Sequence, residues 1–153
     1  MDITVVKGNM DYLADCRESL LNSELRDVYF ISEERTKTFL IEGLTKEEIF
    51  VALDQSGVCL GFIWIALAGA FCRFPYVDLL AVKERYRGRG VGCSLLSFFE
   101  QEGFKKAPKL FIMVSDFNHR AKKLYESRGY KEVGMIPEFL KPGVAEYIMM
   151  KSK

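Results

Sequence analysis

Residues 79–92 read Leu-Leu-Ala-Val-Lys-Glu-Arg-Tyr-Arg-Gly-Arg-Gly-Val-Gly, an apolar run followed by a turn rich in glycine and arginine. The apolar residues predict a β-strand, and the residues from Gly90 onward predict the start of an amphipathic helix. Glycine lets the backbone approach a ligand closely, and the N–H groups at a helix N-terminus attract anions. Arg87 and Arg89 add planar cationic groups that suit phosphate. The stretch therefore predicts a phosphate-binding loop, and the alternative is a polar loop with a helix cap.

Two other phosphate loops fit this stretch poorly. A Walker loop needs Lys-Ser or Lys-Thr after its last glycine, whereas Gly92 is followed by Cys93 and Ser94. The glycine fingerprint of dinucleotide-binding folds expects glycine or alanine in place of Cys93 and an acidic residue at the end of the next strand. The next expected strand, residues 110–114, is followed closely by Asp116, so that fit is partial. Nucleotide triphosphate hydrolysis is therefore disfavoured.

The spacing of the loop resembles that of a known family. The pattern Arg87-x-x-Gly90-x-Gly92 looks like the acetyl-CoA pyrophosphate loop of the GNAT N-acetyltransferase superfamily. Downstream, the chain is similar to the second half of the same cofactor site in the pattern Asn118-x-x-Ala121-x-x-Leu124-Tyr125-x-x-x-Gly129-Tyr130. Two motifs in the family's order are more specific than one. The same segments resemble the ribosomal-protein N-terminal alanine acetyltransferases, although many small-molecule members share them.

The resemblance implies a fold and a cofactor. The fold is α/β, with one central, mixed, V-shaped sheet and helices on both faces, in a single domain spanning residues 1–153. The co-substrate is acetyl-CoA, whose pantetheine arm lies between two splayed strands and pairs with one of them. The residues that the resemblance assigns to acetyl-CoA are Leu80, Ala81, Val82, Arg87, Gly88, Arg89, Gly90, Val91, Gly92 and Asn118. For Asn118, a helix N-cap is an equal alternative to a pantetheine contact.

Acetyl transfer from a thioester to an amine needs a neutral amine, a stabilised oxyanion and a proton for the departing thiolate. Tyr125 matches the family tyrosine that supplies this proton, and a core aromatic residue is the alternative. Asp78 and Glu146 are the candidate bases. At neutral pH an α-amine of pKa about 8 is appreciably neutral, whereas a lysine amine is about one part in a thousand neutral. A chain without an obvious base therefore favours an α-amine or a weakly basic amine slightly.

Three functions from different classes fit these motifs. The first is an acetyl-CoA-dependent N-acetyltransferase that acts on a peptide N-terminus or a small amine. The second is a non-catalytic acyl-CoA sensor, and the third is an interaction module whose loop binds another phosphorylated partner. Tyr125 favours catalysis because neither alternative needs a proton donor. The acceptor is expected to contact residues 25–44, with Tyr29, Phe30 and Phe39, and residues 137–144.

The composition is that of a soluble globular protein. With 22 basic and 21 acidic side chains among 153 residues, the net charge gives no reason to expect nucleic acid or an anionic membrane as a partner. The chain has one histidine, and its four cysteines lack metal-ligand spacing, so we expect no metal and reduced, mostly buried thiols. The start lacks the pattern of a secretory signal, and the apolar run 58–72 is too short for a membrane span. We expect a cytoplasmic protein, and a homodimer remains open.

Hydrophobic periodicity predicts alternating helices and strands. Helices are expected over 11–21, 32–42, 90–102 and 118–128, and strands over 3–6, 49–53, 58–67, 76–82, 110–114, 130–135 and 146–151. Ser32 is the expected N-cap of the second helix and Gly43 its end. Gly129 is expected to close the last helix, and residues 137–143 are expected to form a loop.

Overall fold

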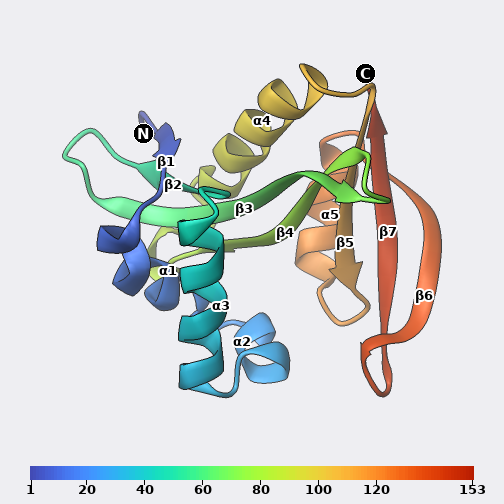
Figure 1. The fold of residues 1–153 in the computed structure, drawn as a ribbon, viewed down its shortest axis with the longest axis horizontal. Helices are drawn as coiled ribbons and strands as arrows, with labels where there is room; N and C mark the ends of the chain where they lie inside the picture. Colours follow the sequence, from blue (N-terminus) through green and yellow to red (C-terminus); the bar gives the residue numbers. More distant parts are fainter. The chain divides into compact units, whose positions relative to one another are not determined.

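The computed structural model describes all 153 residues, and its elements alternate as the sequence predicts (Figure 1). The strands are β1 (Thr4–Lys7), β2 (Ile49–Leu53), β3 (Cys59–Ala70), β4 (Phe74–Val82), β5 (Lys109–Ser115), β6 (Lys131–Lys141) and β7 (Val144–Ser152). The helices are η1 (Met10–Tyr12), α1 (Leu13–Leu20), α2 (Glu24–Tyr29), α3 (Glu33–Thr45), η2 (Glu84–Tyr86), α4 (Val91–Phe104) and α5 (His119–Ser127). All seven expected strands and all four expected helices are present. Most of their ends shift by a few residues, whereas β6 extends well beyond its expected end at residue 135.

The strands form one seven-stranded sheet in the order β1-β2-β3-β4-β5-β7-β6. The β4 and β5 strands run parallel, with Tyr76 opposite Phe111, whereas β1 with β2, β2 with β3, β5 with β7 and β6 with β7 pair antiparallel. This mixed sheet confirms the expected α/β class. The chain divides into two compact units: unit 1 is residues 1–65 and 79–99, and unit 2 is residues 66–78 and 100–153. That the whole chain is a single domain stays a prediction.

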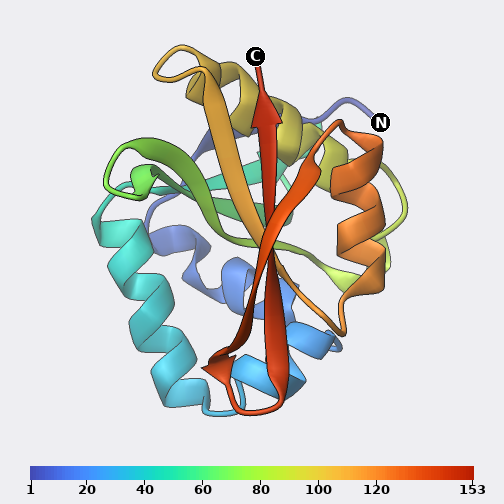
Figure 2. The same ribbon diagram turned by 90° about the vertical axis from the view of Figure 1, so that its right-hand side faces the viewer.

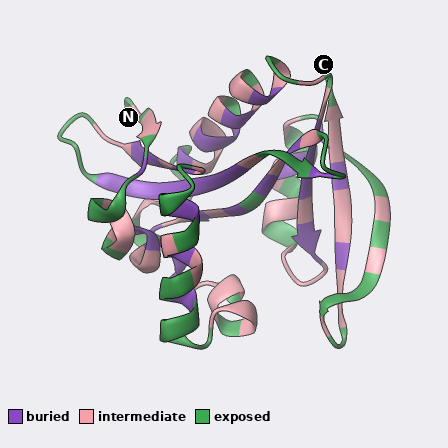
Figure 3. Ribbon diagram, viewed as in Figure 1, coloured by how far each residue is buried: buried purple, intermediate pink, exposed green.

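The core of unit 1 is an apolar cluster under α1 and α3. Its buried residues are Cys16, Leu20, Leu40, Leu44, Ile49, Val51, Cys59, Phe62, Trp64, Leu79 and Ala81. The first part of β3, residues 59–65, is buried, as Figure 3 shows. The apolar run 58–72 is therefore a core strand over its first half only, because Leu67 and Phe71 are exposed. Phe39 packs its ring 4.5 Å from that of Trp64, measured between centroids. Phe39 is half-buried and packs against this core.

Gly43 does not end its helix, so that prediction was wrong. Ser32 caps α3 as expected, its hydroxyl accepting from the Arg35 amide, but the helix continues to Thr45. A Cβ on Gly43 would lie 2.7 Å from Ile49 Cδ1 and 2.9 Å from the Trp64 ring. Gly43 is needed for close packing of α3 against β2 and β3, because any side chain there would displace these core residues.

The helix α2 was missed by the sequence analysis. It is six residues long and contains no buried residue, so it gives no hydrophobic period to detect. Its one local signal is Ser23, whose hydroxyl accepts from the Arg26 amide at 3.2 Å in an N-cap.

Unit 2 is built on β5, β7 and β6, and Figure 2 shows β6 and β7 as one long, twisted hairpin. The loop expected over 137–143 was wrong, because β6 extends to Lys141 and the chain turns within two residues at Pro142 and Gly143. Gly143 has φ +80°, which favours glycine, and the register is irregular between Ile136 and Lys141. Lys122 of α5 contacts both strands: its Nζ lies 2.7 Å from Glu132 Oε1 and 4.0 Å from the centre of the Tyr147 ring.

Two further expectations concern thiols and membranes. All four cysteines are free, but only Cys16 and Cys59 are buried, whereas Cys93 is half-buried and Cys72 is exposed. None of the helices combines the length and the apolar character that crossing a bilayer requires.

Candidate functional site

The glycine turn after β4 leaves a set of backbone N–H groups available. Gly88 and Gly90 have φ of +74° and +84°, which side chains rarely adopt. The first hydrogen bond of α4 runs from the Ser94 amide to the Gly90 carbonyl at 3.0 Å. The amides of Val91, Gly92 and Cys93 therefore have no partner within the helix, at the end where its dipole favours negative charge.

The space beside this turn fits an anionic group. A Cβ built on Gly90 meets no atom within 4 Å, so the turn faces open space there. Arg89 is exposed between the two glycines and takes part in no hydrogen bond or ion pair. Free amides, an unpaired guanidinium and open space together suit a phosphate or pyrophosphate group. We call residues 87–92 the pyrophosphate loop.

Arg87 is placed differently from Arg89. Its guanidinium donates to four backbone carbonyls of unit 1: from Nε to Val82 at 2.9 Å, from Nη1 to Asn22 at 2.8 Å, and from Nη2 to Leu21 at 2.9 Å and Ser19 at 3.5 Å. We expected this side chain to offer charge to phosphate, and the structure instead uses its donors to join the loop to the end of α1. The Arg87 backbone amide donates to Glu84 at 3.2 Å.

The segment before the loop is tied to α1 by ion pairs. The Lys83 side chain is only 4% exposed, and its Nζ lies 2.6 Å from Asp15 Oδ1 and 2.8 Å from Glu18 Oε2. Burial lowers the pKa of Lys83, but hydrogen bonds and attraction to these two carboxylates outweigh burial and raise it overall. Asn22 Nδ2 donates to Glu84 Oε2 at 2.7 Å.

The strand expected to pair with pantetheine is the end of β4, residues 80–82, which lies in unit 1. Ala81 is buried, and Leu80 and Val82 are half-buried. A Cβ on Gly61 of β3 would lie 2.6 Å from the Ala81 carbonyl oxygen, so glycine there allows β3 to approach this strand closely. These three residues end β4, which is followed by Lys83, η2 and then the pyrophosphate loop.

Tyr125 lies on α5 in unit 2 and is 5% exposed. The helix is closed by Gly129 at φ +91°, as expected. Burial, and to a lesser extent Tyr76, raises the pKa of Tyr125 above its ordinary value. The hydroxyl is therefore protonated at neutral pH.

The two candidate bases have different surroundings in unit 2. Glu146 is 3% exposed and accepts a hydrogen bond from the Ser115 hydroxyl at 2.6 Å, across the β5–β7 pair. Asp78 is exposed on β4. Burial, then Asp78 and then Glu146 raise the pKa of Tyr76, so both carboxylates act on this one phenol.

Tyr76 was not among the site residues expected from the sequence. Besides burial, Asp78 and Glu146 raise the pKa of Tyr76, and Tyr76 raises that of Tyr125, so electrostatic interactions connect these four residues. A signal was present, because Tyr76 lies two positions before Asp78 and side chains at i and i+2 of a strand share a face.

Asn118 caps α5, with Oδ1 accepting from the Ala121 amide at 3.3 Å. The N-cap alternative is thus confirmed, and a pantetheine contact by its amide group stays a prediction.

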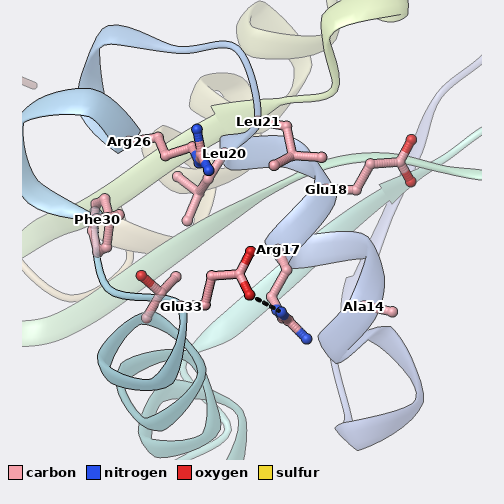
Figure 4. Close-up of a pocket in the computed structure, with 9 residues that line it drawn as sticks. Ala14, Arg17, Glu18, Leu20, Leu21, Arg26, Phe30 and Glu33 are labelled. Carbon is pink, nitrogen blue, oxygen red and sulfur yellow. Dashed lines mark ion pairs between the residues drawn. The ribbon is translucent and has the colours of Figure 1, made fainter.

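Unit 1 also contains a pocket of about 250 Å³ between α1, α2 and the start of α3 (Figure 4). It is lined by Ala14, Arg17, Glu18, Leu20, Leu21, Arg26, Phe30, Glu33 and Thr36. Figure 4 shows Arg17 and Glu33 pointing toward each other, 3.8 Å apart. Several of these residues fall in the stretch 25–44 where the sequence placed acceptor contacts, and Phe30 is the aromatic among them.

Comparison with known proteins places this chain in a family. The model of the acetyltransferase (GNAT) domain matches residues 45–132, which include β4, the pyrophosphate loop and α5. The chain belongs to the GNAT acetyltransferase family. A solved GNAT-family acetyltransferase from Bacillus cereus superposes with a TM-score of 0.77 at 18% identity, covering 100% of this chain and 99% of that one. The GNAT fold expected from the two motifs is thereby confirmed.

Two curated relatives are more similar in sequence to this GNAT chain than the Bacillus cereus protein is. An uncharacterised protein of Mycobacterium leprae is 30% identical over 67% of this chain, and an uncharacterised N-acetyltransferase of Methanocaldococcus jannaschii is 33% identical over 51% of it. The matched residues span 28% and 51% of the lengths of these relatives, respectively.

Proposed function

We propose that this protein is an acetyl-CoA-dependent N-acetyltransferase that acts on a primary amine. The observation that carries the proposal is the buried Tyr125 hydroxyl, which is kept protonated at the position where the family motif places a proton donor. The pyrophosphate loop supports it, because its free amides and Arg89 fit the phosphates of coenzyme A.

Acetyl-CoA supplies the acetyl thioester. The amine nitrogen attacks the thioester carbonyl, the carbon–sulfur bond breaks, and the nitrogen loses its extra proton to solvent water. In this proposal the amides of residues 88–92 and Arg89 bind the pyrophosphate, and Leu80, Ala81 and Val82 offer backbone groups to the pantetheine arm. Tyr125 donates its proton to the thiolate, so that a neutral thiol leaves and the phenolate is later reprotonated from solvent.

The favoured acceptor is an α-amine, for example a peptide N-terminus. Glu146 is buried and accepts a hydrogen bond from the Ser115 hydroxyl, and Asp78 is exposed, so neither carboxylate stands out as a dedicated general base. An α-amine needs no strong general base to deprotonate it, because at pH 7 about a tenth of it is already neutral. A lysine amine would need a strong base to reach the same neutral fraction.

The first prediction tests this choice of acceptor. With an α-amine acceptor at pH 8, Asp78→Asn and Glu146→Gln should each lower kcat/KM by less than about tenfold, because the amine is largely neutral without a base. The pH profile of kcat/KM should follow the pKa of the acceptor. A loss of about 100-fold or more in either variant, with Kd for acetyl-CoA retained, would identify that carboxylate as an essential base and refute the assignment.

We further propose that an apolar group of the acceptor enters the pocket of unit 1. Leu20, Leu21 and Phe30 offer it apolar surface, and Arg17, Arg26 and Glu33 provide charged groups at the same pocket. An amine with an apolar side chain and a nearby polar group, such as a peptide N-terminal residue, matches this lining.

The second prediction concerns Phe30. Phe30→Leu should raise the acceptor KM by about fivefold and leave Kd for acetyl-CoA unchanged, because it removes the ring from the pocket. Phe62→Leu is the matched control: this residue is buried in the core of unit 1 but does not line the pocket, so the substitution should lower stability without changing KM. Equal effects of the two variants on KM would show that Phe30 acts only through packing.

The acceptor itself can be found with a panel of peptides, amino acids, polyamines and aminoglycosides, assayed for release of free thiol from acetyl-CoA. The proposal expects release above background with at least one α-amine. A sensor would bind acetyl-CoA with no release for any acceptor, and an interaction module would not bind acetyl-CoA in calorimetry.

A further inference from the structure

We infer that Arg87 is a positioning residue, which shapes the pyrophosphate loop by holding it to the end of α1, and that Arg89 is the cation that meets the phosphates. This inference rests on the proposed binding of acetyl-CoA. It gives different roles to two arginines that were both expected, from the sequence, to offer positive charge to the phosphates.

The hydrogen bonds of Arg87 carry the first half of the inference. A guanidinium has five N–H donors in a planar fork. In Arg87, donors on all three nitrogens are directed at carbonyls: Nε at the last residue of β4, and both terminal nitrogens at residues 19, 21 and 22. Four of the five donors are used in this way, so Arg87 has only one N–H, on Nη1, left for another acceptor.

The carbonyls that Arg87 binds are ones that need a donor. Ser19 lies in the last turn of α1, and Leu21 and Asn22 follow the helix, where carbonyl groups have no partner within the helix. A cation at a helix C-terminus is also favoured by the helix dipole. Arg87 therefore caps α1 and at the same time anchors the residue that opens the pyrophosphate loop.

Neighbouring contacts strengthen this connection. Lys83 is buried between Asp15 and Glu18 of α1, and Glu84 accepts from Asn22, which has φ +52°. Arg85 adds a further contact, with its Nη2 3.4 Å from Glu18 Oε1, so four residues of the segment 83–87 are joined to residues 15–22. Its last anchor, Arg87, stands directly before Gly88, the first glycine with positive φ.

Arg89 has the opposite surroundings. It is exposed, it lies between Gly88 and Gly90, and no carboxylate or carbonyl engages its guanidinium. An exposed cation attracts an anionic ligand through a charge that salt screens, whereas a hydrogen-bonded clamp acts through geometry that salt screens much less. The two roles therefore predict different salt dependence.

The third prediction uses this difference in four variants: Arg87→Ala, Arg87→Lys, Arg89→Ala and Arg89→Lys. Calorimetry would give Kd for acetyl-CoA from about 0.02 M to about 0.5 M salt. Both Arg87 variants should raise Kd by about fivefold with the wild-type salt slope, because a lysine keeps the charge but cannot span the carbonyls. Arg89→Ala should raise Kd mainly at low salt, so that Kd depends less steeply on salt concentration than in the wild type. Arg89→Lys keeps the charge and should restore most of the wild-type affinity and salt dependence.

Two results would overturn the inference: wild-type Kd in Arg87→Lys, or a flattened salt slope in Arg87→Ala. If Arg87→Ala does not fold, the Kd of Arg87→Lys alone tests the positioning role of Arg87. A readout without ligand separates this inference from the proposed function. In hydrogen exchange of the free protein, Arg87→Lys should speed exchange of amides in residues 84–94, and Arg89→Lys should not. Failure of the wild-type protein to bind acetyl-CoA refutes the proposed function, and equal exchange in the two variants refutes the role of Arg87.

Discussion

Replacing Tyr125 with phenylalanine should lower kcat for acetyl transfer by about 100-fold and leave Kd for acetyl-CoA nearly unchanged. The substitution keeps the buried ring and removes only the hydroxyl. Since burial raises the pKa of this hydroxyl, it is protonated in the resting protein and can give its proton to the thiolate as the carbon–sulfur bond breaks. The lost interaction belongs to the transition state, so kcat falls and ground-state binding does not.

Tyr130→Phe is the matched control for this experiment. Tyr130 is 2% exposed, its ring centre lies 6.2 Å from that of Tyr125, and its buried hydroxyl lies near Glu100 but makes no hydrogen bond of good geometry. Removing this poorly paired hydroxyl should leave kcat unchanged and change stability little. Wild-type kcat in Tyr125→Phe would remove Tyr125 from the mechanism, and equal losses of kcat in the two variants would point to packing around α5.

The second large effect is expected at Gly90. Gly90→Val should raise Kd for acetyl-CoA at least about tenfold, equivalent to about 1.4 kcal/mol. Two causes act together: φ of +84° disfavours any side chain, and the space in front of Gly90, now free of atoms, is the space that we assign to the pyrophosphate. The measurement is calorimetry on the folded variant, with thermal unfolding measured in parallel.

Gly57 provides a control with the same backbone strain. It also has φ +84° and no atom within 4 Å of a built Cβ, but it lies in the turn between β2 and β3. Gly57→Val should therefore lower stability about as much as Gly90→Val while Kd for acetyl-CoA stays at the wild-type value. A similar Kd for Gly90→Val and the wild type would contradict the assignment of the loop to pyrophosphate.

Much of the fold could be predicted because the deciding signals are local. The face of α4 formed by Val91, Leu95, Leu96 and Phe99 is visible as a helical period, and all four side chains are at most 1% exposed. Gly43 shows the limit of such reasoning. Its place near the end of a helical pattern suggests a helix cap. Glycine is needed there because Ile49 and Trp64 leave no room for a side chain, and the tertiary fold brings these two residues close to Gly43.

The same limit applies to the site. The pyrophosphate loop and Tyr125 were predicted from local motifs. The role of the Arg87 side chain could not be, because its partners at residues 19, 21 and 22 lie 65 to 68 positions away in the chain. The pocket was missed in detail for a related reason, since it depends on α2, which is too short to show a period.

One measurement tests the central claim most directly: the amounts of free coenzyme A thiol and of N-acetylated amine formed in the same sample, determined by thiol titration and mass spectrometry. The proposed function predicts that the two products appear in equal amounts, only when acetyl-CoA, the acceptor amine and the protein are all present, and that Tyr125→Phe slows both alike. Thiol release that is independent of the amine, or an amine that stays unmodified while acetyl-CoA is bound, would contradict acetyl transfer by this chain.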